Sequence, residues 1–287
     1  MSQQPSLSLV IPAYNESARL GRTLASVFAY LDEQPYRAEL LVVDDGSTDD
    51  TAGVAERGFA EAGRTQARVI RVEPNRGKGH AVRAGLLAAR APIALFTDAD
   101  LSTPITETPK LVAPIRAGQY DIVFGSRALD RNLIGVHQPW RREQSGKVFN
   151  LAVRLATGLP FADTQCGFKA FRMDVCRAVV EGARIDRFGF DVELLYVAHL
   201  AGLRLRERAV RWNDVAGSKV TLRNGVEGFL ELRELRRQAR RGVYDESVER
   251  ARAAASRPDA RAPIPVEGSA VAPSDASPEL ASTARRI

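Results

Sequence analysis

The sequence predicts an α/β protein with an open, mostly parallel sheet flanked by helices. Short apolar runs of strand length alternate with stretches of helical periodicity, and short loops join them. Polar loops follow the predicted strands, which is where open parallel sheets bind ligands. No Gly-x-Gly-x-x-Gly follows the first strand and the chain has no Walker A motif, which disfavours a dinucleotide-binding dehydrogenase and a P-loop protein.

The first half of the chain carries the clearest alternation of strands and helices. The expected strands are residues 7–11, 39–43, 68–72, 93–96 and 121–125. The expected helices are residues 18–31, 51–62 and 80–89. The first of these helices repeats its apolar residues at the spacing of one helical face, with Leu20, Leu24, Val27 and Leu31.

After residue 126 the pattern changes. We expect a loop over residues 137–142 and then a helix over residues 143–157, whose apolar positions are Val148, Leu151, Ala152 and Leu155. Further along, the expected elements are a turn into a strand over 163–171, a helix over 190–201, a strand over 205–210 and a polar loop over 212–220. A basic amphipathic helix is expected from Gly225 to Arg241.

Length and composition limit the domain organisation. The chain has 287 residues, of which 45% are apolar, enough for one sizeable core. We expect one domain over residues 1–242. Residues 251–287 are rich in Ala, Pro, Ser and Arg, so they are expected to form a disordered tail.

Charge and cysteine content indicate partners and compartment. The net charge of +6, with an isoelectric point near 9.6, favours anionic partners such as phosphates or acidic lipids. The two cysteines, Cys166 and Cys176, form neither a zinc signature nor a disulfide framework, which fits a reducing compartment. No apolar run approaches the roughly 20 residues of a membrane span, and the N-terminus lacks a signal-peptide pattern. We therefore expect a cytoplasmic protein that can contact a membrane surface.

Two carboxylates directly follow the expected strand 93–96. Asp98 and Asp100 are two residues apart, so in extended backbone their side chains share one face. Magnesium and manganese prefer such oxygen ligands and complete their coordination with water and substrate phosphate. The functional interpretation is a metal–diphosphate site. The alternative is a polar turn before a helix, because an isolated Asp-x-Asp is common.

Three other polar loops are expected at the same edge of the sheet. They are residues 12–16, 44–48 and 75–79. Together with residues 98–102 they would line a crevice of nucleotide size.

The motifs of these loops and of the second half of the chain resemble those of a known family. Residues 8–20, 41–51, 75–85, 98–100 and 125–127 are similar to the family 2 inverting glycosyltransferases with a GT-A fold. Three later motifs, residues 163–169, 190–196 and 217–219, are similar to the dolichyl-phosphate β-glucosyltransferase branch, which is related to the dolichyl-phosphate mannosyltransferases. The resemblance extends from about Leu7 to Arg240. It implies a Rossmann-like nucleotide-sugar half over residues 7–126 and an acceptor half over residues 127–242.

The resemblance assigns the donor side of the site. It implies that Asp100 is the direct ligand of Mg²⁺ or Mn²⁺ and that Asp98 contacts the ribose or a metal-bound water. It also implies that Asp44 or Asp45 accepts hydrogen bonds from the uracil or ribose. The remaining expected nucleotide-sugar contacts are Pro12, Tyr14, Asn15, Glu16 and Lys78, although Tyr14 could also be a core residue. Lys78 lies between two glycines, which suits a close approach of the backbone to the ligand.

The acceptor side follows from the same resemblance. Arg127 and Lys219 are expected to bind the acceptor phosphate and the donor diphosphate. Asp163 and Gln165 are expected to contact sugar hydroxyls or to order the acceptor loop. Asp191 is assigned to acceptor positioning, because a phosphate is already ionised at neutral pH; general-base catalysis is the alternative. Arg141, Arg142 and Lys147 are expected to extend the phosphate-binding surface.

The expected donor and acceptor sites together predict a glycosyl transfer reaction. The main hypothesis is transfer of glucose from UDP-glucose to a polyprenyl phosphate, with inversion. The alternatives are a GDP-mannose donor, a soluble acceptor, or a nucleotide-sugar sensor without catalysis. The helix from Gly225 to Arg241 either contacts an anionic membrane or packs on the domain with its arginines in solvent. Nucleic acid is not expected as a partner, because the basic residues lack interleaved aromatic residues.

Overall fold

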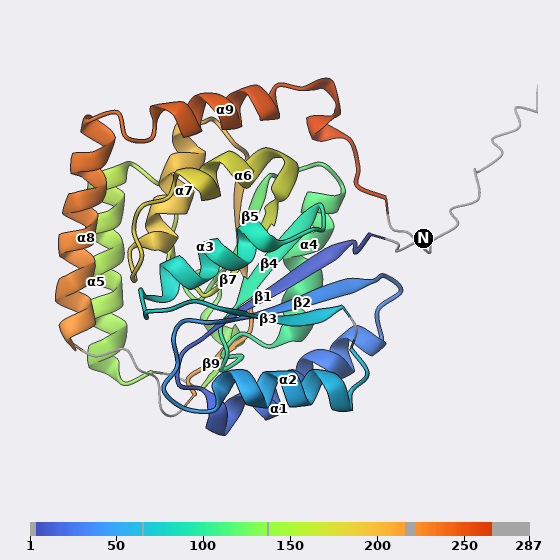
Figure 1. Cartoon of the computed structure of the whole chain (residues 1–287). Coiled ribbons are helices and arrows are strands. Elements are labelled where there is room, and N and C mark those ends of the chain that lie inside the picture. Colours follow the sequence, from blue (N-terminus) through green and yellow to red (C-terminus); the bar gives the residue numbers. More distant parts are fainter. Residues whose placement is uncertain (1–3, 65, 137, 216–221, 266–287) are drawn as a thin grey trace, which may run out of the picture.

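The computed structural model describes residues 4–64, 66–136, 138–215 and 222–265. Seven strands form one sheet in the order β3-β2-β1-β4-β7-β5-β8, and β6 and β9 form a second, two-stranded sheet (Figure 1). The strands are β1 Leu7–Ala13, β2 Ala38–Asp44, β3 Ala67–Arg71, β4 Ile93–Thr97, β5 Ile122–Ser126, β6 Ile134–Val136, β7 Phe168–Arg172, β8 Leu205–Ala209 and β9 Trp212–Asn213.

The α-helices of the described residues cover both faces of the large sheet. They are α1 Ser17–Asp32, α2 Thr51–Glu61, α3 Lys78–Ala88, α4 Thr108–Arg116, α5 Trp140–Thr157, α6 Met173–Gly182, α7 Phe190–Leu200, α8 Leu222–Arg240 and α9 Asp245–Ala255. One core cluster lies between the sheet and α1, α2 and α4, and the other between the sheet and α3, α6 and α7. Because both faces are covered, β1, β2 and β4 are almost continuous apolar runs rather than alternating ones.

The expected parallel sheet is confirmed, with one strand of opposite direction. β1 pairs in parallel with β2 and β4, and β2 pairs in parallel with β3. β7 lies between β4 and β5 and is antiparallel to both. Since β7 runs backward, it starts at the edge where β4 and β5 end, with Phe168 opposite Thr97. This reversal brings residues 163–169 to the carboxyl edge of the parallel strands.

Helix α5 differs from the expected helix in its start and in the stripe that it buries. It begins at Trp140, so the prediction of a loop continuing to residue 142 is wrong. The buried residues are Phe149 and Val153, four apart on one face. Of the four apolar residues that predict the helix from the sequence, Val148, Leu151 and Leu155 are exposed, and Ala152 is partly buried against the core. The helix is thus confirmed, although most of the apolar residues that predict it do not face the core.

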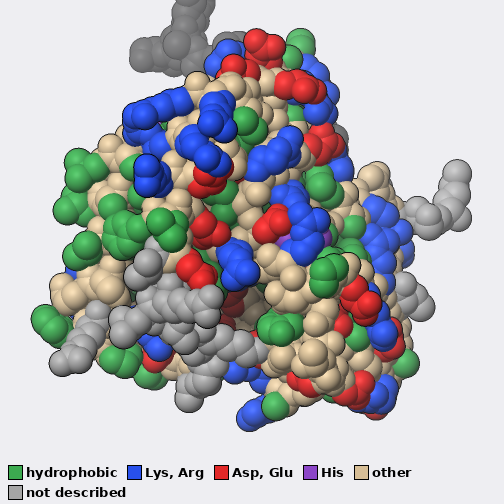
Figure 2. Space-filling model, turned by 60° about the vertical axis from the view of Figure 1, so that its left-hand side comes forward, with side chains coloured by type: hydrophobic (Ala, Val, Ile, Leu, Met, Phe, Trp, Pro, Cys, Tyr) green, Lys and Arg blue, Asp and Glu red, His purple; other side chains and the backbone are tan. Residues whose placement is uncertain are grey.

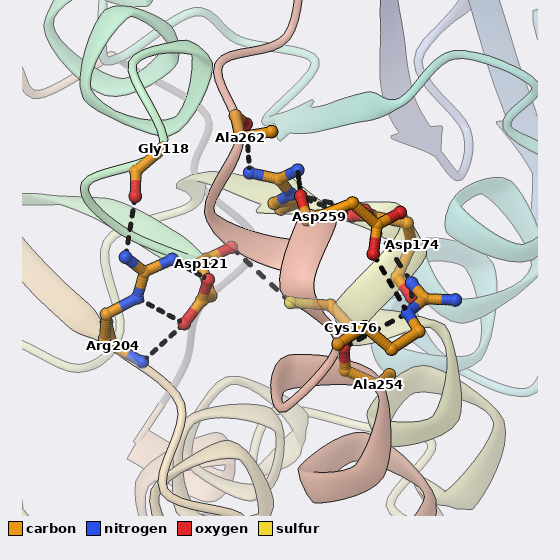
Figure 3. Close-up of polar contacts among 10 residues, drawn as sticks. Gly118, Asp121, Asp174, Cys176, Arg204, Ala254, Asp259 and Ala262 are labelled. Carbon is orange, nitrogen blue, oxygen red and sulfur yellow. Dashed lines mark hydrogen bonds and ion pairs between the residues drawn. The ribbon is translucent and has the colours of Figure 1, made fainter.

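The predicted tail is wrong for residues 251–265. Residues Asp245–Ala255 form α9, which packs on α6 and α7, and Ala251 is fully buried. Hydrogen bonds hold the segment that follows α9 against β7 and α6. Arg172 donates to the carbonyls of Ala262 (2.9 Å) and Asp259 (3.3 Å), and Arg257 donates to the carbonyl of Asp174 (Figure 3). The folded unit therefore extends at least to residue 265 and not only to 242. Residues 266–287 of the predicted tail lie outside the described residues.

Tyr244 joins this C-terminal segment to the core. Its hydroxyl donates to the carboxylate of Glu193 at 2.6 Å, and both side chains are almost fully buried. Glu193 also accepts from the backbone N–H groups of Arg184 (2.8 Å) and Ile185 (2.9 Å), so it fixes the turn between α6 and α7. Burial raises the pKa of Glu193, while these hydrogen bonds act in the opposite direction.

Replacing Tyr244 with Phe should destabilise the protein, because a buried carboxylate loses one of its donors. We expect a loss of about 1–3 kcal/mol in the free energy of unfolding, measured by urea denaturation. Tyr120→Phe is the matched control, because Tyr120 is only partly buried and its ring faces Arg206; its effect should stay within about 0.5 kcal/mol. Equal effects of the two variants would contradict the role given to the Tyr244 hydroxyl.

Candidate active site

The carboxyl ends of the parallel strands gather most of the predicted site residues at one edge. Asp44 ends β2, Asp98 follows β4 and Arg127 follows β5. The start of the antiparallel β7 and the first turn of α7 add Lys169 and Asp191 to the same region. Residues distant in sequence therefore form one polar edge on an apolar sheet.

Asp98 and Lys78 form the first ion pair of the site. Lys78 starts α3, and its Nζ lies 2.5 Å from Oδ1 of Asp98. Burial lowers the pKa of Lys78, but the carboxylates of Asp98 and Asp191 more than offset this effect, so the net direction is upward. Lys78 thus remains charged, next to the place where the donor diphosphate is expected.

The space beside Asp98 requires a glycine. A Cβ on Gly167 would lie 2.1 Å from Oδ2 of Asp98, well inside a van der Waals contact. The backbone supports the same geometry, because the N–H of Asp98 donates to the carbonyl of Gly167 at 3.2 Å. Gly167, in the motif before β7, therefore determines where the Asp98 carboxylate sits.

Asp100 differs from Asp98 in forming no ion pair among the described residues, although its charge contributes to raising the pKa of Lys78. One of its oxygens accepts the N–H of Ser102 at 2.9 Å, and among the described residues no basic side chain forms an ion pair with it. The turn between them holds Leu101 at φ 48°, a conformation that costs energy for a residue with a side chain. A partly exposed carboxylate on a strained turn is suited to bind a cation.

Lys169 and Asp191 form a second, fully enclosed ion pair. Nζ of Lys169 lies 2.5 Å from Oδ1 of Asp191 and also donates to the carbonyl of Cys166 at 2.7 Å. Lys169 has no exposed surface, and its ammonium group lies 5.4 Å from the centre of the Phe96 ring. Burial raises the pKa of Asp191, although Lys169 and Lys78 act against that shift. The pair fixes Asp191 at the N-terminus of α7.

Arg127 and Asp163 form the third pair, in a bidentate geometry. The guanidinium of Arg127 donates to the two oxygens of Asp163 at 2.7 and 2.8 Å, and the N–H of Arg127 adds a third bond at 3.0 Å. Burial alone would raise the pKa of Asp163, but the charge and hydrogen bonds of Arg127 lower it to about 2. Glu207 on β8 anchors the loop by accepting the N–H groups of Ala162 and Asp163.

The loop carrying Asp44 and Asp45 is built largely by these carboxylates. Asp44 accepts the N–H of Ser47 at 3.0 Å. Asp45 accepts the N–H groups of Gly77 (2.7 Å) and Arg76 (3.2 Å), and so ties the loop after β2 to the start of α3. Burial raises the pKa of Asp45 despite these hydrogen bonds.

The glycines around Lys78 pack against the protein rather than stand open for a ligand. Gly77 has φ 116°, and a Cβ there would lie 2.6 Å from the carbonyl oxygen of Asp186. A Cβ on Gly79 would lie 2.6 Å from Cβ of Phe190. The expected close approach is thus to the segment before α7, which places Lys78 near Asp191.

The loop after β1 lies beside the loop after β2. The side chain of Asn15 accepts the N–H of Thr48 at 2.8 Å, and the N–H of Asn15 donates to the hydroxyl of Ser47 at 2.9 Å. Glu16 pairs with Arg19 at 2.7 Å. Pro12 is buried within β1, whereas Tyr14 is 38% exposed and is not a core residue.

A basic cavity of about 180 Å³ adjoins the Arg127–Asp163 pair. Four basic side chains line it and two acidic ones, Glu143 and Asp163, partly balance their charge. The basic residues are Arg127, Arg131, Arg142 and Lys147. Trp212 closes the cavity beside Arg127, whose guanidinium carbon lies 5.7 Å from the indole ring. The first turns of α5 border the cavity, and a helix N-terminus favours anions.

The structure brings most predicted site residues to this edge and adds others. Lys219 lies outside the described residues, and nothing is described of the Arg141 side chain. Sequence reasoning did not assign roles to Lys169, Gly167, Glu207 or Trp212. A signal existed for Lys169 alone: a lysine inside the apolar run 168–171 requires a buried partner for its charge.

The fold and the sequence of this chain are similar to those of known glycosyltransferases. The fold and the motifs at the edge of the sheet are those of a glycosyltransferase with the GT-A fold. Residues 8–180 match the model of glycosyl transferase family 2, and the chain belongs to this family.

Two curated relatives are similar over most of their length. The dolichyl-phosphate beta-glucosyltransferase of Drosophila melanogaster is 37% identical over 225 residues, which are 75% of this chain and 69% of that protein. The human enzyme of the same name is 35% identical over the same shares of the two chains.

Among solved structures, glucosyl-3-phosphoglycerate synthase of Mycobacterium tuberculosis has a similar fold. It aligns with a TM-score of 0.60 at 22% identity, over 80% of each chain. A structure of that enzyme with Mn²⁺, UDP and its product aligns with a TM-score of 0.56 at 23% identity, over 86% of this chain and 80% of the other. At these identities the likeness shows the fold.

The Arg127–Asp163 pair should contribute stability that depends on pH. The carboxylate has a folded-state pKa of about 2 against an ordinary 3.8, so its contribution is complete above about pH 4 and is lost as the pH falls through 2. We expect Asp163→Asn to lose about 2 kcal/mol of unfolding free energy at pH 7, and less at pH 3, in urea denaturation.

Asp50→Asn is the control for this experiment. Asp50 pairs with Arg57 on the surface, where both side chains are more than half exposed, so its effect should stay below about 1 kcal/mol. A loss at Asp163 that does not change between pH 7 and pH 3 would contradict the electrostatic explanation.

Gly167→Ala should impair transfer more than stability. The added methyl group displaces the Asp98 carboxylate, and a shift of about 1 Å in a catalytic geometry costs roughly a hundredfold in rate. The measurement is kcat/KM for sugar transfer, together with the melting temperature. Gly21→Ala in α1 is the control, because its nearest neighbour would lie at 3.9 Å; a similar rate loss in both variants would rule out the steric role of Gly167.

Proposed function

We propose that this glycosyltransferase moves glucose from UDP-glucose to a polyprenyl phosphate, with inversion, and forms a β-linked lipid-phosphate glucose. The observation that carries the proposal is the basic cavity lined by Arg127, whose guanidinium interacts electrostatically with Asp98. Arginine and lysine form strong charge-assisted hydrogen bonds to phosphate, so such a cavity suits a phosphorylated acceptor better than a neutral one. The names of the similar enzymes, dolichyl-phosphate beta-glucosyltransferases, support the choice of sugar and acceptor.

The donor diphosphate is assigned to the Asp98–Asp100 corner, with Mg²⁺ or Mn²⁺. Among the described residues no three His, Cys, Asp or Glu side chains gather, so such an ion would have few protein ligands. This agrees with magnesium chemistry, in which water and phosphate supply the other ligands. Asp98 is engaged by Lys78, which leaves Asp100 as the proposed direct ligand and Asp98 as a contact to the ribose or a coordinated water. The bound ion would neutralise charge on the departing diphosphate.

Around that corner, the chain's own residues are proposed to hold the donor. Asp44 and Asp45 shape the pocket for uracil and ribose through the loops that they tie together, with Pro12, Tyr14, Asn15 and Glu16 as its wall. Lys78 stabilises negative charge on the diphosphate, because it stays protonated between two carboxylates.

On the acceptor side, the phosphate is proposed to bind between Arg127 and Lys147, in the basic cavity. Asp163 orients the Arg127 guanidinium, and Gln165 lines the same cavity. Lys219 is proposed as a further phosphate ligand. Since a phosphate monoester is ionised at neutral pH, the attack needs no general base. Asp191, fixed by Lys169, is therefore proposed to position the acceptor near the sugar carbon.

The acceptor is a lipid, so the enzyme must reach a bilayer. No helix within residues 4–64, 66–136, 138–215 and 222–265 is long and apolar enough to cross one. We propose peripheral contact with an anionic membrane on its cytoplasmic side, through the basic helix from Gly225 to Arg241.

Incubation with UDP-[14C]glucose, decaprenyl phosphate and Mg²⁺ should place the label in the lipid phase. Asp100→Ala should reduce this transfer by about 100- to 1,000-fold, because charge on the leaving group is no longer neutralised. Asp32→Ala is the control, since Asp32 pairs with Arg64 on the surface. Label on a soluble acceptor only, or transfer from GDP-mannose in place of UDP-glucose, would overturn the proposed acceptor or donor. An active Asp100→Ala variant would remove the metal assignment.

A further inference from the structure

Helices α5 and α8 pack side by side along one side of the molecule (Figure 1). Phe149 of α5 and Phe229 of α8 meet edge to face with their ring centres 5.2 Å apart. Toward the core, α5 buries Phe149 and Val153, and α8 buries Leu232 and Leu235. Each helix thus already has an apolar stripe that is covered by the fold.

A second apolar stripe on α5 has no cover in the described structure. Val148, Leu151 and Leu155 repeat at intervals of three and four residues on one face, and are 60%, 56% and 78% exposed. Trp140, two turns before Val148 on the same face, is 71% exposed, and Phe229 and Leu230 of α8 are 44% and 61% exposed. These six are more than half of the eleven exposed large hydrophobic residues, so the apolar exposure of the described chain is concentrated here.

The most exposed charged side chains around this stripe are basic. Among the described side chains of α5 and α8, the exposed charged residues are all basic. The acidic residues of these helices are only partly exposed. The exposed basic residues are Lys147, Arg154, Arg233, Arg237 and Arg240. Figure 2 shows this side of the molecule, with hydrophobic side chains on the left and basic ones gathered above them.

We infer that the outer face of α5, together with Phe229 and Leu230, inserts into the surface of a bilayer containing anionic phospholipids. An apolar stripe with basic flanks is the composition of a helix that lies in a membrane interface. A second copy of this chain is a poorer occupant, because it would bring two basic faces together. A helix in contact with water on its outer side needs only one apolar stripe, and α5 has two.

The position of this face connects it to the site. Gly146 and Lys147 line the basic cavity, and the next residue, Val148, belongs to the exposed stripe. A phosphate held in the cavity would therefore be attached to a chain that leaves along α5 into the apolar layer. This inference rests on the proposed function and deepens it, because it adds the exposed apolar face of α5 to the basic helix α8 as the element that enters the membrane.

Sedimentation of the full chain with vesicles tests the inference. The chain should bind vesicles of phosphatidylcholine with 30% phosphatidylglycerol, and bind less to phosphatidylcholine alone. The double variant Leu151→Gln/Leu155→Gln should reduce the partition coefficient at least about tenfold, since two apolar side chains no longer enter the lipid. Leu151→Phe/Leu155→Phe is the matched control, because it keeps both positions apolar; it should bind like the unmodified chain.

A second measurement follows Trp140 directly. The emission of Trp140 should shift to shorter wavelength on binding to these vesicles, and Trp140→Phe should abolish the shift, because the other tryptophan, Trp212, is buried. Arg233→Gln/Arg240→Gln should weaken binding to the anionic vesicles, while Arg57→Gln/Arg71→Gln on α2 and β3 should not.

Equal vesicle binding by the Gln and Phe double variants would overturn the inference. So would a stable dimer of the unmodified chain that the Gln variant converts to monomers, since the face would then join two copies. Transfer assays separate this inference from the proposed function. The Gln variant should keep its kcat with a short-chain, water-soluble polyprenyl phosphate and lose activity with acceptor in vesicles. Vesicle binding without transfer to any polyprenyl phosphate would refute the proposed function and leave the docking face standing.

Discussion

The insertion of β7 between β4 and β5, antiparallel to both, is the constraint on which the site depends. A parallel strand in that place would begin at the opposite edge of the sheet and would carry residues 163–169 away from Asp98. Because β7 runs backward, Gly167 contacts the Asp98 carboxylate and Lys169 extends toward Asp191. The same reversal puts Asp163 within reach of Arg127 at the end of β5. One change of strand direction thus joins the two halves of the chain at one place.

Charge pairing then decides which groups remain available. Removing an ion from water is costly unless a partner and hydrogen bonds replace the lost hydration. Lys78 with Asp98, Lys169 with Asp191 and Arg127 with Asp163 meet this requirement at the edge of the sheet. Asp100 lies beside these pairs without a basic partner among the described residues. Like Asp44, Asp100 accepts a backbone N–H, and neither of these two carboxylates forms an ion pair among the described residues.

Helix α5 carries two apolar stripes, of which the fold buries only one. Its buried stripe explains why the helix packs on the domain, and its exposed stripe is surplus to folding. Burying a large apolar side chain contributes about 1.5–3 kcal/mol, so folding gains nothing from those that stay in water. The surplus lies next to the basic cavity, and the two features together suit an acceptor with a charged head and an apolar chain.

The sequence by itself determined the strand–helix alternation, the parallel direction of the first strands and the loops at their carboxyl ends, but not the order of the strands in the sheet. Local periodicity and turn residues carry this information, so Asp44, Lys78 and Asp98 could be placed at one edge without coordinates, whereas the role of Arg127 came from the family resemblance. The sequence did not predict the contacts that depend on non-local pairing. The partners Lys169 with Asp191 and Glu207 with the Asp163 loop depend on strand direction and order. Periodicity also does not say which of two apolar stripes on α5 meets the core, nor that residues 251–265 pack on α6 and α7. Only the tertiary structure decided these points, because burial depends on which surfaces the rest of the chain brings into contact.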